Sequence, residues 1–557
     1  MNPRDQRRRA GGRSGWLGLL MTGVLLVGCS NAAGTLTPVP TATSSPPKFS
    51  PTEATTSTPL RQPGATPTAT PTPAGTQAPI ATATPTPDAS PSSPAPARSD
   101  PTSIPAALPV RGLTIGLGSE ILGSEILMAP RPQGGLYVSI PSTEEDPPFG
   151  TVVALLDPSG QVARGWPIRL VDALICSPPL VATDGSVRIV CETGDESGRA
   201  LAFDATGRML PGWPVVIEGW GRWGGGQRVI GDRLVVVGHG SYESVDSVTG
   251  WANEAWLITV DADATVSIGA RLRADGPWSI GPDATAYGVS HPSPWAEGPS
   301  PPQVSVITAF DLAGPRPGWP ARVDGVASAP AFGPEGQLYL TVGSYTKAAS
   351  RTVVLDRDGQ IVPGGSRELP IATAAAIESE GTWTPSSPLV AADGTAFVSG
   401  GPASDSRWNA PGDTTVFALD SSGRVMRGWP QIPCWPPVGE GWLDAVASAL
   451  GPGKVVYSLC AAPDAGSSVE PTTGGSIVAT GPDGRVRPGW PLVLSSPRAE
   501  IRSAVVGPDG TVYAVAIEPE SDHLGSATIL TIEPDGTVRS RTTVATRVNY
   551  YPIPPMT

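Results

Sequence analysis

Histidine is nearly absent from this 557-residue chain, and the short motifs of common catalytic sites are missing. Its three histidines, His239, His291 and His523, are far apart and lack metal-ligand spacing. No GxSxG, HExxH or P-loop sequence occurs, which excludes the usual hydrolase, zinc-protease and nucleotide-binding arrangements. Basic residues are outnumbered, 37 against 50 acidic ones. The formal charge of -13 therefore argues against nucleic acid as a partner.

The N-terminus has the pattern of an export signal. Arg7, Arg8 and Arg9 precede an apolar run that is too short to span a bilayer permanently. The run ends in Leu-Val-Gly before Cys29, which resembles the lipobox of bacterial lipoproteins. This predicts a signal peptide over residues 1–28, acylation of Cys29 by chains such as palmitate, and a membrane-anchored, extracytoplasmic protein. An ordinary signal peptide with a chance cysteine is the alternative.

Cysteine is also scarce, and four cysteines remain after Cys29. In an exported protein an even number suits two disulfides, and the close pairs Cys176–Cys191 and Cys434–Cys460 are the predicted ones. Zinc ligation is the alternative, but it lacks a CxxC sequence or a nearby histidine. Residues 29–109 are rich in Pro, Thr and Ser and have almost no aliphatic periodicity. Such a segment cannot bury enough surface to fold, so it is predicted to be a disordered tether.

Helical periodicity is absent from residues 110–557, where a unit of four short apolar runs recurs. One unit reads SSPLVAADGTAFVSG, a polar insert, then TTVFALDSSGRVMRGWP. Tight Asp-Gly and Ser-Gly turns join strands 1 and 2 and strands 3 and 4. The turns recur about every 54 residues, which makes eight units. The predicted fold class is all-β, an eight-bladed β-propeller of four-stranded antiparallel blades.

The repeats resemble a known family. SAPAFGPEGQLYLTVGS with VVLDRDGQIVPG, and SAVVGPDGTVYAVAI with ILTIEPDGTV, are similar to the PQQ-like, quinoprotein-type propeller repeat. The resemblance implies the eight-bladed fold over nearly all of residues 112–545. Enzymes of that kind typically show an adjacent cysteine pair and a calcium site at the ring centre. No Cys-Cys occurs here, so the cofactor site is not carried over and no cofactor or metal is predicted.

Five units close with Gly-Trp-Pro. A residue as large as Trp at a blade's edge is predicted to wedge against the next blade, and five equivalent ligand sites are the alternative. The Asp-x-x-Gly turns offer one carboxylate each, so they favour turn formation over calcium binding. The tryptophans of the motif are Trp166, Trp213, Trp319, Trp429 and Trp490.

Both hairpin turns of a blade point to one end of a propeller, so the inserts between strands 2 and 3 point to the other. The inserts hold seventeen acidic residues and two basic ones, a larger negative charge than the -13 of the whole chain. They therefore suit cations or a basic partner, or are simply solvated loops. Three Trp residues of the links between units could stack on a ligand or wedge between blades. The candidate ligand face comprises Trp223, Trp383, Trp442, Glu144, Glu145, Asp146, Glu518, Glu520 and Asp522.

These features favour a monomeric, non-enzymatic binding or scaffold module for protein or glycan in the cell envelope. The sequence leaves open whether the protein is an enzyme. A PQQ-dependent dehydrogenase-like or polysaccharide-active enzyme is the alternative, because carboxylates for glycoside cleavage meet only in the folded chain.

Overall fold

A computed structural model describes most of the repeat region. The chain divides into two compact units, Met1–Pro91 and Ser92–Thr557, and all described residues belong to the second. The described residues are 102–103, 121–122, 126–145, 148–171, 173–193, 198–217, 226–243, 251–273, 278–290, 304–343, 350–369, 387–400, 415–431, 445–460, 474–496, 499–520 and 524–549.

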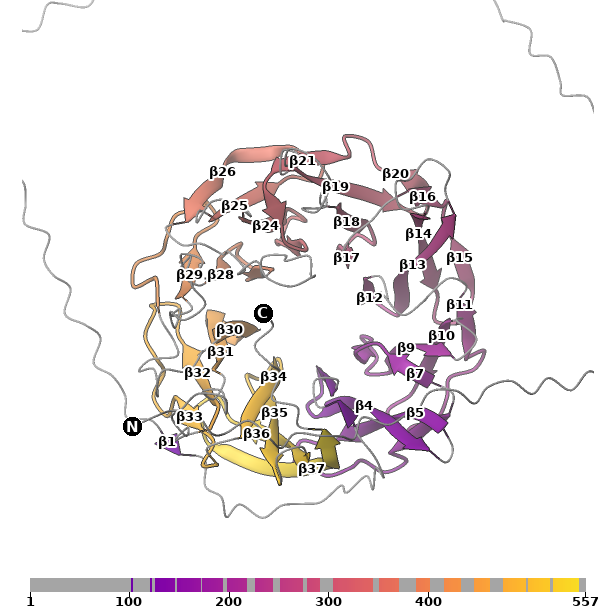
Figure 1. Ribbon diagram of the computed structural model, residues 1–557, viewed down its shortest axis with the longest axis vertical. Helices are drawn as coiled ribbons and strands as arrows, with labels where there is room; N and C mark the ends of the chain where they lie inside the picture. The colour runs from indigo at the N-terminus through magenta and orange to yellow at the C-terminus, as the bar shows by residue number, and fades with distance from the viewer. Residues whose placement is uncertain are drawn as a thin grey trace, which may run out of the picture. The chain divides into compact units, whose positions relative to one another are not determined.

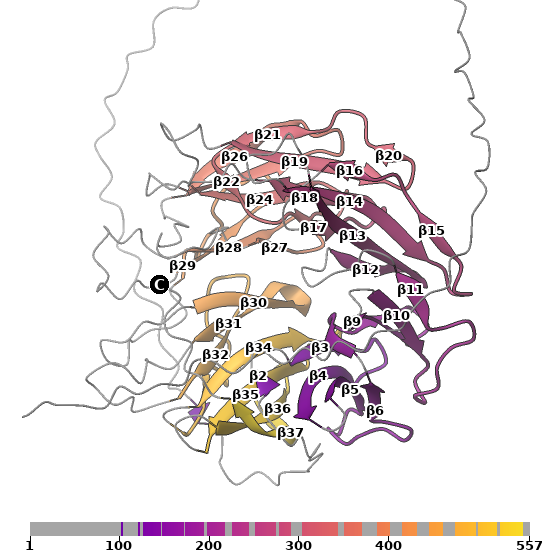
Figure 2. The same ribbon diagram turned by 45° about the vertical axis from the view of Figure 1, so that its right-hand side comes forward.

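The second unit is a ring of eight antiparallel sheets (Figure 1). The first strand of each blade lies nearest the centre of the ring and the last lies at its periphery, and Figure 2 shows the same arrangement from a second direction. This confirms the predicted all-β, eight-bladed propeller. The strands form because short runs of β-branched and aromatic residues alternate with Gly-containing turns.

The first four blades follow the chain in order. Blade 1 contains β3 (Leu127–Pro130), β4 (Leu136–Glu145), β5 (Pro148–Leu156) and β6 (Ile168–Val171). Blade 2 contains β7 (Ala173–Cys176), β8 (Leu180–Val181), β9 (Val187–Thr193), β10 (Gly198–Phe203) and β11 (Val215–Ile217). Blade 3 contains β12 (Gln227–Ile230), β13 (Arg233–Glu243), β14 (Trp251–Val260), β15 (Val266–Ile268) and β16 (Leu272–Arg273). Blade 4 contains β17 (Trp278–Ile280), β18 (Ala286–Ser290), β19 (Val304–Asp311), β20 (Gly314–Pro315) and β21 (Ala321–Asp324).

The other four blades complete the ring. Blade 5 contains β22 (Val326–Ala327), β23 (Ala331–Phe332), β24 (Leu338–Gly343), β25 (Ser350–Leu355) and β26 (Ile361–Leu369). Blade 6 contains β27 (Leu389–Val390), β28 (Ala396–Gly400) and β29 (Thr415–Leu419). Blade 7 contains β30 (Ala445–Gly451), β31 (Val455–Cys460), β32 (Ser476–Thr480) and β33 (Leu492–Val493). Blade 8 contains β34 (Glu500–Val506), β35 (Val512–Pro519), β36 (Leu524–Ile532) and β37 (Val538–Asn549).

Blade 6 has no continuous fourth strand among the described residues. Val425 and Gln431 each form a single bridge to β29, so the outer segment still follows the sheet. The Gly428-Trp429-Pro430 sequence interrupts the ladder between these bridges. Of the described residues only Pro452–Lys454 are helical, as a short 3-10 turn, and no described helix is long and apolar enough to cross a membrane.

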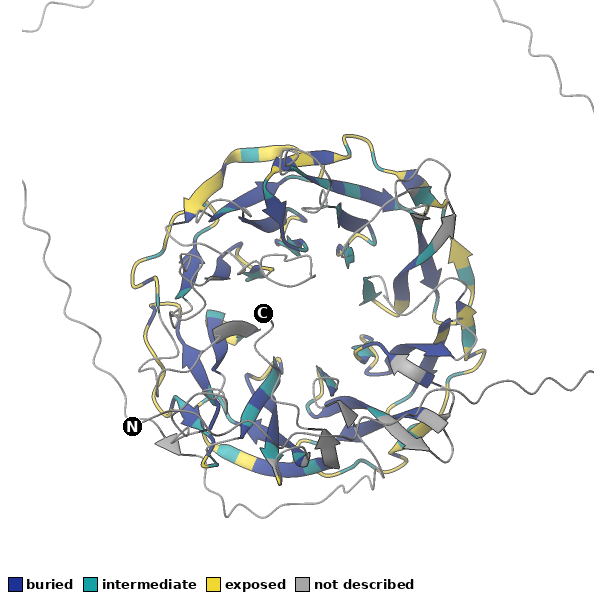
Figure 3. Cartoon of the chain, in the orientation of Figure 1, coloured by how far each residue is buried: buried dark blue, intermediate teal, exposed yellow. Residues whose placement is uncertain are grey.

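The core lies between blades, because successive side chains of a strand face opposite neighbours. In β13, Val236 packs with Val190 of blade 2, whereas Val237 packs with Ile280 of blade 4. The same alternation buries the middle strands of every blade on both faces (Figure 3). Each seam between blades is therefore an apolar layer, and stability depends on all eight blades being in place.

Blade 8 closes the ring directly against blade 1. The hydroxyl of Thr542 donates to the carbonyl oxygen of Gly160 at 2.8 Å, and Arg539 donates to the carbonyl oxygen of Pro158 at 3.1 Å. The four antiparallel strands of blade 8, β34 to β37, all come from the C-terminal part of the chain.

Two earlier segments pair with the outer edges of the last blades. Strand β1 (Thr102–Ser103) pairs in parallel with β33 of blade 7, and β2 (Ile121–Leu122) pairs in parallel with β37 of blade 8. Strand β1 lies before residue 110, where the propeller was predicted to start. The part of the chain that precedes the repeats is thus joined to the wall of blades 7 and 8.

Candidate functional site

The ring has two chemically different ends. At the turn end, strands 1 and 2 and strands 3 and 4 of each blade are joined by tight turns. At the insert end lie the connections between strands 2 and 3 and between blades, which range from a short link between Glu145 and Pro148 to a long one between Gly400 and Thr415. Length variation is therefore concentrated at the insert end, where binding loops are expected on a rigid scaffold.

Aspartate side chains build the turn end. Oδ1 of Asp157 accepts hydrogen bonds from the backbone N–H groups of Ser159 at 2.8 Å and Gln161 at 3.0 Å. Asp204, Asp356 and Asp420 repeat this pattern. The hydrogen bond from the Ser422 hydroxyl, opposed by slight burial, holds the pKa of Asp420 below its ordinary value. These carboxylates stabilise turns, as the single carboxylate per turn predicts.

The Gly-Trp-Pro tryptophans join consecutive blades at this end. The indole N–H groups of four of the five donate to a carbonyl in the second hairpin turn of the next blade, at 3.0 to 3.3 Å. The bonds are Trp166 to Ala205, Trp319 to Arg357, Trp429 to Pro482 and Trp490 to Pro534. The preceding glycine is needed because a Cβ on Gly489 would lie 1.9 Å from the carbonyl oxygen of Asp535. These four rings occupy blade contacts rather than a ligand surface.

An aromatic residue on the second strand supports each of these rings. Tyr137 meets Trp166 edge to face with centroids 5.5 Å apart, and Tyr457 meets Trp490 in the same way at 5.4 Å. Tyr287 with Trp319 and Phe397 with Trp429 complete the set. Sequence analysis did not identify these partners, although an aromatic residue near the start of the second strand recurs in several units.

Trp213 is the exception. Its indole N–H is buried and, among the described residues, has no acceptor. The turn that faces it in blade 3 carries Ala264 at φ +68, where other units have glycine. A Cβ on Gly212 would lie 2.9 Å from the Ala264 methyl group, so glycine is needed here as well. The seam between blades 2 and 3 lacks the indole hydrogen bond that four other seams have.

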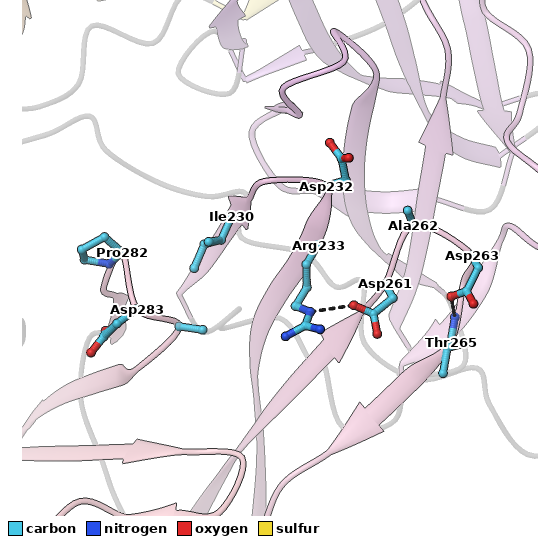
Figure 4. Close-up of a pocket in the computed structure, with 10 residues that line it drawn as sticks. Ile230, Asp232, Arg233, Asp261, Ala262, Asp263, Thr265, Pro282 and Asp283 are labelled. Carbon is cyan, nitrogen blue, oxygen red and sulfur yellow. Dashed lines mark hydrogen bonds and ion pairs between the residues drawn. The ribbon is translucent and has the colours of Figure 1, made fainter.

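Next to this seam the turn end is hollowed by a depression of about 820 Å³ (Figure 4). It runs from the two hairpin turns of blade 3 to the first turn of blade 4. Its lining is Ile230, Asp232, Arg233, Asp261, Ala262, Asp263, Thr265, Pro282, Asp283 and Ala284. Ala264 and Ala284, both with positive φ, belong to two of its three turns.

The depression is acidic, with four carboxylates and one guanidinium group. Nε of Arg233 lies 2.6 Å from Oδ1 of Asp261 (Figure 4). Burial alone would raise the pKa of Asp283, but hydrogen bonds from Arg316 and Thr285 outweigh it and lower the pKa. The N–H of Thr265 lowers the pKa of Asp263. Carboxyl groups held ionised suit the binding of a cationic group better than proton donation.

The sequence alone does not predict a site at this depression. The turns differ from those of other units by only one residue, Ala264 in DADAT and Ala284 in GPDAT. The two alanines, in place of the glycine of other units, are the feature of the sequence that marks this depression. Throughout the described ranges no group of three or more His, Cys, Asp and Glu side chains is positioned to hold a metal ion.

Most of the predicted ligand face cannot be placed. Trp223, Trp383, Trp442, Asp146 and Asp522 lie outside the described residues, as does the lipidation candidate Cys29.

Four acidic members of the predicted face lie in described strands or beside them. Glu144 and Glu145 end β4, and Glu520 is exposed just after β35. Glu518 forms an ion pair with the buried Arg541 of β37. A second ion pair joins Glu500 and Arg502 of β34 at 2.7 Å. The insert end of blade 8 thus has organised charge, but a shared site with the other members stays a prediction.

The Cys176–Cys191 disulfide is confirmed. The two cysteines are direct partners in the ladder of β7 and β9, with Cα atoms 4.0 Å apart. Both side chains are buried. Cys460 is also disulfide-bonded, while its predicted partner Cys434 lies outside the described residues.

Comparison with known proteins gives likeness of fold only. No family model matches the chain, and no curated protein matches it in sequence. Among solved structures it is similar to an acylaminoacyl peptidase, with TM-score 0.38 and 10% identity over 76% of this chain and 54% of the peptidase. The chain thus spans about half the length of that enzyme. It is also similar to Kuenenia stuttgartiensis hydrazine synthase, with TM-score 0.36 and 13% identity over 71% and 93% of the two chains. A putative 6-phosphogluconolactonase from Bacteroides uniformis gives TM-score 0.35 and 14% identity over 72% and 93%.

Proposed function

We propose that this protein is a non-enzymatic binding or scaffold propeller for protein or glycan, held outside the cytoplasm by an acyl chain on Cys29. The observation that carries the proposal is the contrast between the two ends of the ring. At the turn end, apart from the acidic depression of blades 3 and 4 and the indole N–H of Trp213, aspartates and tryptophans are engaged in turns and blade contacts. At the insert end, loops of unequal length project from the rigid ring of blades. This is the arrangement in which propellers and other rigid scaffolds present binding loops.

The charge of the insert end indicates the chemistry of the ligand. Its seventeen acidic and two basic residues create a negative potential, which attracts cationic groups and disfavours anionic ones. A basic protein surface or an amine-bearing glycan fits that potential. Trp side chains in the inter-blade links would add stacking area for sugar rings or peptide.

The test compares two charge-reversed variants of the full chain. The insert-end variant carries Glu144→Lys and Glu145→Lys. The turn-end variant carries Glu335→Lys and Asp358→Lys, at two exposed positions, and makes the same change of charge. Each chain is immobilised and exposed to crosslinked envelope extract and to an array of envelope glycans. We expect the native chain and the turn-end variant to retain the same ligand, and the insert-end variant to lose it. Equal retention by all three chains would overturn the assignment of the binding end.

We also propose kinship with PQQ-like propellers, which rests on the repeat sequences and not on the structural neighbours. The dehydrogenase-like alternative makes a separate prediction, that the purified chain binds PQQ with calcium. Saturable binding of both would favour that enzyme class over a binding module.

A further inference from the structure

The outer edges of blades 6 and 7 carry a concentration of positive charge on a protein that is acidic overall. Arg424 and Arg427 flank Val425 in the outer segment of blade 6, and Arg485 and Arg487 flank Val486 at the same place in blade 7. The two blades are neighbours, joined by the hydrogen bond from Trp429 to Pro482. We call the four arginines and two valines the basic wall.

The basic wall is open to solvent. All four arginines are exposed, and Val425 and Val486 are 43% and 37% exposed, which is high for aliphatic residues. Within the described part of the chain, Asp483 is the only carboxylate within 4 Å of these guanidinium groups, at 3.9 Å from Arg485. The guanidinium group of Arg424 also contributes to lowering the pKa of Asp420, so its charge is partly balanced by that carboxylate. The charges of Arg427 and Arg487 are available to a partner.

Other blades do not repeat this concentration. The matching outer segments of blades 1 and 2 hold one exposed arginine each, Arg164 and Arg208. In blade 4, Arg316 at the matching place is engaged with Asp283 at 2.6 Å. The basic wall is thus a local feature and not a property of the repeat.

The first described strand of the chain, β1, lies beside the basic wall, at the outer edge of blade 7. Strand β1 pairs with β33, the outer strand of blade 7, a few residues beyond Arg485 and Arg487. The residues before β1 lead toward the predicted tether and Cys29.

We propose that the basic wall docks on an anionic lipid bilayer surface. This rests on the membrane anchoring in the proposed function. Arginines near an anionic bilayer each strengthen binding about fivefold, and the exposed valines between them suit the boundary between headgroups and acyl chains. With the basic wall against the membrane, the axis of the ring would run parallel to the bilayer surface. Neither end of the ring would then be covered, so the insert end would stay accessible.

The experiment uses the predicted mature chain, residues 29–557, carrying Cys29→Ser. Neither an acyl chain nor the basic and apolar signal segment then contributes to membrane binding. Its cosedimentation is compared on phosphatidylcholine vesicles with and without phosphatidylglycerol. The wall variant changes all four arginines to glutamine. The matched control changes Arg164, Arg199, Arg208 and Arg322 to glutamine, four exposed arginines on blades 1, 2 and 4.

We expect binding to the anionic vesicles only, weakened by salt and lowered about fivefold for each wall arginine replaced. The control variant should keep most of the binding. An equal loss in both variants, or no preference for the anionic vesicles, would overturn the proposal. So would tight binding of the wall to soluble polyphosphate without binding to vesicles, which would point to an anionic polymer instead. None of these results bears on ligand retention at the insert end, so the two proposals fail separately.

Discussion

The indole N–H of Trp490 in blade 7 donates a hydrogen bond to the carbonyl oxygen of Pro534 in blade 8, 3.3 Å away, and the indole ring is fully buried. Trp490→Phe removes this bond and part of the buried ring, so it should lower the free energy of unfolding by about 1 kcal/mol more than Trp213→Phe does. Trp490→Ala also leaves a cavity and should cost about 3–5 kcal/mol. Chemical denaturation measures both changes. Trp213→Phe is the control, because it removes no hydrogen bond, and an equal loss there would contradict the role of the bond.

Ala264 holds a backbone conformation that glycine adopts without strain, φ +68. A non-glycine residue in this region costs about 1–2 kcal/mol, while glycine adds a smaller entropy cost in the unfolded chain. Ala264→Gly should therefore stabilise the protein by about 1 kcal/mol and raise its melting temperature. The control is Ala205→Gly, at a turn residue of blade 2 without positive φ. It should lower the melting temperature, and a rise there would contradict the strain argument.

Lys454 of blade 7 forms an ion pair with Asp393 of blade 6 and donates to Thr395 at 3.2 Å. Its hydrogen bond, followed by those from Thr395, lowers the pKa of Asp393 to about 2. Because the folded-state pKa is depressed, this contribution to stability is present above the ordinary aspartate pKa near 3.8 and is lost as pH falls toward 2.

Lys454→Gln should raise the pKa of Asp393 toward its ordinary value. It should also reduce the fall in stability between pH 4 and pH 2. Carbon-detected NMR of the Asp393 carboxyl reads the pKa, and melting curves across this range read the stability. An unchanged titration of Asp393 in the variant would show that the ion pair does not form in solution.

The disulfide between Cys176 and Cys191 closes a loop with a sequence separation of 15 residues. Closure of a loop of this length is expected to stabilise a protein by about 3 kcal/mol. The double variant Cys176→Ala with Cys191→Ala should show that loss in denaturation. Alkylation of the unreduced protein after unfolding in denaturant should label neither cysteine, and labelling of both would mean that the bond is absent.

The blades could be predicted because each unit carries its own local pattern. SSPLVAADGTAFVSG alone predicts a hairpin, and eight such patterns with regular spacing predict a closed ring. The Gly-Trp-Pro contacts also follow from local chemistry, since a glycine, a large ring and a proline at a strand end indicate a departure from the ladder and a wedge.

Features that arise from contacts between blades could not be predicted in this way. The acidic depression combines turns of blades 3 and 4 that become neighbours only after the seams pack. The indole N–H of Trp213 has no acceptor among the described residues, and the turn that it faces belongs to another blade. Strand β1 comes from a Pro/Thr-rich segment with no strand pattern, so only its partner β33 explains it. The ligand face depends on the conformation of long inserts, which short-range patterns do not determine.

The parallel pairing of β1 with β33 has a mechanical consequence. Any pull transmitted along the N-terminal segment reaches blade 7 first, through a strand of two residues. That strand would peel away before tension reached β2 on blade 8, and both would yield before the interlocked blades. The ring would stay closed, because β1 and β2 lie at the outer edges of their sheets and not among the strands that pack between blades.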